Sequence, residues 1–187
     1  MALRQQAAKG FFWNLADNFA VQLIQFATGV YMARILSPDD YGLMGMLLLF
    51  TALSDAIMNG GFSTALIRKT DRTDTDAATA FCFNIGMGLL LYGILFVAAP
   101  AIAMFYEAPL LEDLVKVAAI PFVVNAFFLV QRTYLTIRMD FKRQARISIA
   151  AALVKGATGI GMAYGGYGVW AIAWSGVAGA VTSCLLY

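Results

Sequence analysis

The hydrophobic pattern divides the chain into six apolar segments that are separated by short polar stretches. The segments cover residues 11–36, 41–60, 77–106, 111–131, 147–164 and 169–187. Each is close to the roughly 20 residues that a helix needs to cross the hydrocarbon core of a bilayer. Inside lipid, helices satisfy their own backbone hydrogen bonds, so segments of this length favour helices. The pattern therefore predicts an all-α, polytopic membrane protein with six transmembrane helices.

Three of the polar stretches carry recognisable boundary signals. One signal is typical of a helix start: serine as the N-cap at Ser37, proline at the first helical position at Pro38, and an acid at Asp40. The glycine-rich stretch at 165–168 predicts a tight turn before the last segment. The longest polar connection, around residues 68–76, ends in Asp and Thr residues that can cap the third helix.

The first segment carries polar side chains on one side of its predicted helix. They are Asn14, Asp17, Asn18, Gln22 and Gln25. At about 100° per residue these five side chains fall within an arc of roughly 140°. Polar side chains that face hydrocarbon are costly, so this arc must face other helices or a water-filled cavity. Two interpretations stay open: hydrogen bonding between helices, and the lining of a transport pathway.

Lys155 lies near the middle of the fifth segment and shares a helical face with Ser148 and Thr158. Charged side chains inside a bilayer are rare and mark functional sites by default. One interpretation is a cation that binds an anion in a cavity. The alternatives are an internal ion pair, with Asp17 or Asp55 as the partner, and a side chain that reaches towards the membrane surface.

The second segment carries a polar stripe formed by Thr51, Asp55 and Asn59, which are spaced four residues apart. Asp55 could accept a proton or pair with a cation, or the stripe could make hydrogen bonds to a neighbouring helix. Arg34 follows the first segment and could receive a phosphate that leaves a cavity, or anchor the helix at the lipid headgroups.

The distribution of cations predicts a cytoplasmic N-terminus. With that orientation, 10 of the 13 Lys and Arg residues fall in cytoplasmic segments, as the positive-inside rule requires. Five of them lie within 132–146, and topology together with anionic lipid headgroups explains this cluster. The cluster consists of Arg132, Arg138, Lys142, Arg143 and Arg146.

Composition narrows the function classes. Hydrophobic residues make up 61% of the chain and charged residues 13%, against about 25% charged residues in soluble domains. A net charge of +2 gives no indication of nucleic-acid binding. The chain has no histidine, and its two cysteines lie in apolar segments, so neither a metal site, a cofactor nor a catalytic triad is predicted. We therefore expect a protein that is not an enzyme.

Four stretches, in order, resemble one family. RILSPDDYG at residues 34–42 is similar to the signature at the first outer loop of bacterial polysaccharide flippases. GFSTALIR at 61–68 and APAIAMFY at 99–106 resemble the ends of their second and third spans. RTYLTIR at 132–138, followed by DFK at 140–142, resembles their fourth-to-fifth connection. The family is that of the lipopolysaccharide and exopolysaccharide export proteins (Wzx type), in the superfamily that also holds multidrug extrusion proteins.

The resemblance implies a two-lobe exporter of the bacterial inner membrane. In such a protein two six-helix lobes surround a central, often cationic cavity, and they alternate access while a polyprenyl-pyrophosphate-linked oligosaccharide crosses. This chain would supply a single N-terminal lobe, residues 1–187, because no second copy of the 34–42 segment is present. We expect either a piece of a longer protein or two copies that assemble as a homodimer.

The resemblance also suggests roles for the polar residues inside the predicted spans. The phosphates would be held by Lys155 and Arg34, and the sugar hydroxyls by Asn14, Asn18, Gln22 and Gln25. Coupling to a proton or a sodium ion would fall to Asp17 or Asp55.

Three other functions compete with this one. A cation-coupled multidrug exporter of the same superfamily would prefer acids to cations in its cavity. A membrane glycosyltransferase would need a catalytic group near a large outer loop, and no connection here exceeds about 15 residues. A non-catalytic membrane scaffold would require neither a charged cavity nor a catalytic group.

Overall fold

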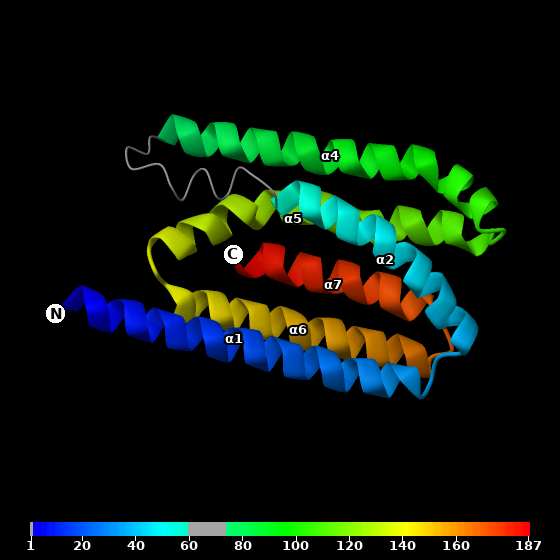
Figure 1. Ribbon diagram of the computed structural model, residues 1–187, viewed down its shortest axis with the longest axis horizontal. Coiled ribbons are helices and arrows are strands. Elements are labelled where there is room, and N and C mark those ends of the chain that lie inside the picture. Colours follow the sequence, from blue (N-terminus) through cyan, green and yellow to red (C-terminus); the bar gives the residue numbers. More distant parts are fainter. Residues whose placement is uncertain (1, 60–73) are drawn as a thin grey trace.

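The computed structural model describes residues 2–59 and 74–187, and these residues form six helices. They are α1 (Ala2–Ala33), α2 (Pro38–Asn59), α4 (Asp74–Phe105), α5 (Leu110–Ile137), α6 (Phe141–Tyr164) and α7 (Trp170–Leu186). Successive helices run in opposite directions, so both chain termini lie at the same end of the bundle (Figure 1). We call this the proximal end. The opposite, distal end holds the α1–α2, α4–α5 and α6–α7 turns.

The helices confirm the predicted all-α fold of a multi-pass membrane protein. Four of them, α2, α4, α5 and α6, are long and apolar enough to cross a membrane. Helix α7 is apolar but has 17 residues. Helix α1 has 32 residues but does not join this group among the described residues, because its polar side chains lower its hydropathy.

Some helices extend beyond the apolar segments that predict them. Helix α1 begins at Ala2 rather than near residue 11, and α5 continues to Ile137 rather than ending near residue 131. The added turns carry Lys, Arg and Gln, which are good helix formers and can leave the hydrocarbon without ending the helix. The segment 61–68 and most of the polar connection at 68–76 lie outside the described residues.

Helix α5 forms the centre of the bundle. It packs against α4 on one side and α7 on the other, while α6 packs against both α7 and α1. Leu111, Leu114 and Phe122 of α5 are buried together with Leu91 and Leu95 of α4. The main packing partner of α1 is α6 and that of α2 is α5, although α1 and α2 are consecutive in the sequence. The two helices therefore diverge from a shared turn.

The two predicted boundary signals at 37–40 and 165–168 are confirmed at the distal end. Helix α2 begins at Pro38, and the Ser37 hydroxyl accepts a hydrogen bond from the Asp40 N–H at 3.2 Å. The Asp40 Oδ2 in return accepts from the Ser37 N–H at 3.1 Å, which completes a reciprocal cap. In the α6–α7 turn, Gly166 and Gly168 have positive φ angles of 78° and 53°, a backbone conformation that favours glycine.

Candidate functional site

An elongated cavity of about 550 Å³ lies among α1, α2, α5, α6 and α7. Its lining extends from Val169, just before α7, to Tyr187, just after it, so the cavity follows this helix over its length. The α6 and α7 walls are built from small residues, which leave room between the helices. These residues are Ala151, Ala152, Gly176, Gly179 and Ala180.

Three charged side chains line the cavity within the described part of the chain: Asp55 of α2, Arg132 of α5 and Lys155 of α6. The Asp55 carboxylate lies within electrostatic range of the Lys155 ammonium group. The stem of Lys155 lies over α7, where a Cβ added to Gly179 would come within 3.2 Å of the Lys155 Cβ. The wall thus carries two cations and one acid.

Neutral polar groups complete the wall, and two of them are hydroxyls that donate hydrogen bonds within their own helices. Thr51 Oγ1 donates its proton to the Leu47 carbonyl, and Ser148 Oγ donates to the Gln144 carbonyl, both at 3.1 Å. Because the Thr51 proton is used within its own helix, the lone pairs of Thr51 Oγ1 can accept a hydrogen bond from a ligand. The Ser148 hydroxyl also lies within hydrogen-bonding range of the Asp17 carboxylate. The neutral polar lining residues are Gln25, Thr51, Asn125, Ser148, Ser183 and Tyr187.

Groups from four helices meet at the proximal end of the cavity. The Tyr187 ring stacks on Phe128, with ring centroids 5.1 Å apart and the rings nearly parallel at 6°. The Asp17 carboxylate lies close to Ser148 and Arg132. Its Oδ1 is buried and accepts no hydrogen bond. Asp17 therefore lies beside the cavity without being part of its lining.

Three of the predicted site residues share the cavity wall: Gln25, Asp55 and Lys155. These residues come from α1, α2 and α6, so the fold brings together side chains that the sequence separates by up to 130 positions. Asp17 lies beside the wall, as described above. Of the polar arc of the first helix, Gln25 thus lies on the same cavity wall as Lys155.

The other four predicted residues lie outside the cavity lining, and all four are exposed. Asn18 Nδ2 donates to Asn14 Oδ1 at 2.6 Å and to the Asn14 carbonyl at 2.9 Å, so these two amides partly satisfy each other. By helical spacing, Asn14 and Asn18 lie within about 20° of the direction of Gln25. Gln22 lies within about 60° of the same direction. They continue the polar face of α1 beyond the cavity, while Arg34 lies in the α1–α2 turn.

Sequence reasoning missed Arg132 as a cavity residue, because it assigned the whole basic cluster to topology. All five residues of the cluster are exposed, but only Arg132 lines the cavity. The signal was present in the spacing. Arg132 follows Asn125 by seven residues, which is two helical turns, so both share one face of α5.

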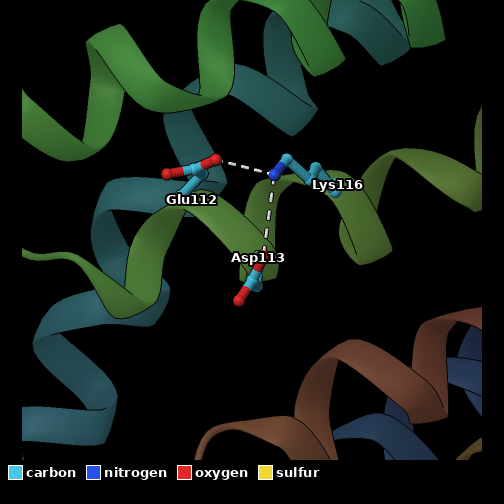
Figure 2. A network of polar contacts seen from close by, with 3 residues as sticks. All are labelled: Glu112, Asp113 and Lys116. Carbon is cyan, nitrogen blue, oxygen red and sulfur yellow. Dashed lines mark hydrogen bonds and ion pairs between the residues drawn. The ribbon is translucent and has the colours of Figure 1, made fainter.

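Lys116 provides a contrast, because its charge is balanced within its own helix. Figure 2 shows its Nζ between the two acids of the first turn of α5, 2.7 Å from Glu112 Oε1 and 3.6 Å from Asp113 Oδ1. The ammonium group also lies 5.3 Å from the centroid of the Phe96 ring of α4. Lys116 lines no part of the cavity, so it serves as a reference cation for Lys155.

The chain belongs to the polysaccharide biosynthesis protein family, whose profile matches residues 31–187. It is 27% identical to the teichuronic acid biosynthesis protein TuaB of Bacillus subtilis, over 79% of this chain and 31% of TuaB. It is 22% identical to the lipopolysaccharide biosynthesis protein WzxC of Escherichia coli, over 82% of this chain and 31% of WzxC. The succinoglycan biosynthesis transport protein ExoT of Rhizobium meliloti is 23% identical, over 86% of this chain and 32% of ExoT.

These relatives confirm the resemblance that the sequence suggests. The expectation of a transport protein rather than an enzyme agrees with these relatives, of which ExoT is named as a transport protein. The chain spans about a third of the length of the curated relatives that it matches. No solved structure matches the chain.

Proposed function

We propose that this chain forms one six-helix lobe of an exporter for lipopolysaccharide or exopolysaccharide biosynthesis. The exporter would move a polyprenyl-pyrophosphate-linked oligosaccharide across the bacterial inner membrane. The observation that carries the proposal is a polar, cation-bearing cavity in an apolar helical bundle of the polysaccharide biosynthesis protein family. The rest of the exporter would come from further polypeptide or from a second copy of this chain.

The chemistry of the cavity wall suits the pyrophosphate and the sugars of such a substrate. The pyrophosphate is anionic, and Arg132 and Lys155 outnumber the single acid, Asp55, among the described lining residues. Sugar hydroxyls both donate and accept hydrogen bonds, and Gln25, Thr51 and their polar neighbours can supply partners. The apolar tail would stay in lipid. A cation-coupled drug exporter would require the opposite balance of charge.

The proposed orientation places the proximal end in the cytoplasm. The basic residues of 132–146 gather around the α5–α6 turn at this end, as the positive-inside rule expects. Transport would proceed by rocking of one lobe against the other around the cavity. Asp17, beside the proximal end of the cavity, and Asp55, on its wall, are the proposed sites for a coupling proton or sodium ion.

The test compares Lys155→Ala with Lys116→Ala in cells whose glycan export depends on the full-length protein. Surface glycan and undelivered lipid-linked oligosaccharide are measured at matched protein levels. We expect Lys155→Ala to lower surface glycan at least tenfold and to raise the lipid-linked pool, whereas Lys116→Ala changes neither by more than about twofold.

Equal glycan export in the two strains would contradict the phosphate-binding role of Lys155. Efflux of a cationic dye in the same strains distinguishes the competing drug exporter. Loss of dye efflux with intact glycan export would replace the proposed substrate class.

A further inference from the structure

The Asp40 carboxylate joins two turns that lie far apart in the sequence. Its Oδ2 accepts hydrogen bonds from the Ser37 N–H at 3.1 Å and the Ser37 hydroxyl at 2.8 Å. Its Oδ1 accepts a hydrogen bond from the Val169 N–H at 3.1 Å, across a sequence separation of 129 residues. An ordinary capping acid accepts hydrogen bonds only at the start of its own helix, whereas this carboxylate accepts them at the starts of both α2 and α7.

Gly168 provides the space that this arrangement requires. Its φ angle is +53°, which side-chain-bearing residues rarely adopt. A Cβ at this position would lie 3.1 Å from Asp40 Oδ1 and 3.7 Å from its Cγ. The two boundary signals of the sequence, at 37–40 and at 165–168, are therefore parts of one structure.

This structure lies at the distal end of the cavity. Val169 is 2% exposed and lines the cavity, and the α7 wall begins directly after it. Helix α2 packs chiefly against α5, and the bond from Asp40 to Val169 attaches it to α7 as well. The bond therefore links the α2 and α7 walls at the distal end of the cavity, which we call its distal mouth.

We propose that Asp40 is a positioning residue that holds the distal mouth of the cavity closed by clasping the start of α2 to the start of α7. An ionised carboxylate makes stronger hydrogen bonds to N–H groups than a neutral acceptor does. The positive end of the α7 dipole adds to this attraction. The proposal does not depend on the substrate, so it can fail while the proposed function stands.

The test measures the access of water to each end of the cavity. Cys82→Ser and Cys184→Ser remove the native thiols, and a single cysteine then replaces either Ala173, near the distal mouth, or Ser183, near the proximal end. The full chain is purified in detergent, and the rate of labelling by a charged maleimide is measured. Asp40→Ala is compared with Asp39→Ala, which changes the neighbouring exposed acid.

We expect Asp40→Ala to raise the labelling rate of the cysteine at position 173 about tenfold and to leave that at 183 within twofold. Gly168→Ala should act in the same direction, because its Cβ displaces the carboxylate. Asp40→Asn keeps one acceptor oxygen, so its labelling rate at position 173 should lie between that of Asp40→Ala and that of the protein with Asp40 intact. Unchanged labelling at 173, or an equal rise at both positions, would overturn the proposal, since general loosening of the fold affects both ends.

Discussion

The side chain of Lys155 lies against Gly179 of the neighbouring helix. A Cβ on this glycine would come within 3.2 Å of the Lys155 Cβ and 3.5 Å of its Cδ. Because α7 presents no side chain here, the stem of Lys155 can lie flat on the helix while the residue remains exposed to the cavity. The position of the cation is thus set by a residue that carries no chemistry of its own.

Gly179→Ala should therefore disturb the cavity cation. We expect an overpacking cost of about 1 kcal/mol in the free energy of unfolding and a two- to fivefold loss of glycan export. Thermal unfolding in detergent and surface glycan in cells measure the two effects. Gly176→Ala is the matched control, because it lies on the same cavity wall and its Cβ would meet nothing within 4 Å. If both variants behave alike, contact with Lys155 is not the cause.

The contact between α1 and α6 should be equally sensitive to a single methyl group. A Cβ on Gly156 would lie 2.7 Å from Thr28 Oγ1, which is too close for any side chain. We expect Gly156→Ala to destabilise the protein by about 1–3 kcal/mol, and Thr28→Ala to restore most of this loss in the double variant. Thermal unfolding of the four proteins in the cycle measures the coupling. Gly161→Ala, with nothing within 4 Å, should cost little.

Arg132 should differ in function from the other members of the basic cluster. We expect Arg132→Ala to lower glycan export about tenfold, because it removes a cation from the cavity wall, and Arg132→Lys to retain part of the export. Arg138→Ala, an exposed change on the same helix end, should leave export within about twofold. Surface glycan is measured together with the amount of protein in the membrane. Equal losses of glycan export in both alanine variants would show that Arg132 acts only as part of the cytoplasmic basic cluster that sets membrane topology.

Periodicity and capping chemistry predicted much of this fold. Hydrophobic segments near the length of a membrane span leave little alternative to helices, and the Ser37–Asp40 pair marked a helix start because its reciprocal bonds are local. Such signals act within a few residues. They cannot show that the second oxygen of Asp40 accepts a bond from Val169, because that partner is chosen by the packing of α2 and α7.

The candidate site was predictable only in part for the same reason. A helical arc gives the direction of Asn14, Asn18 and Gln25 relative to one another, but not which neighbour covers them. Helix α1 packs on α6 through residues such as Thr28 and Met32, and this leaves Gln25 at the cavity and the two asparagines outside it. Arg132 was misplaced because charge count alone explains a basic cluster equally well at a membrane surface.

The carboxylate shared by the α2 and α7 starts has a consequence for chimaeras between related exporters. The α1–α2 loop and the α6–α7 loop form one interlocking unit, although 129 positions separate Asp40 from Val169. A graft that exchanges one loop alone would leave the acid at position 40 without its partner at 169, or would place a side chain at 168 against that acid. Functional hybrids should therefore arise when both loops are transplanted from the same donor.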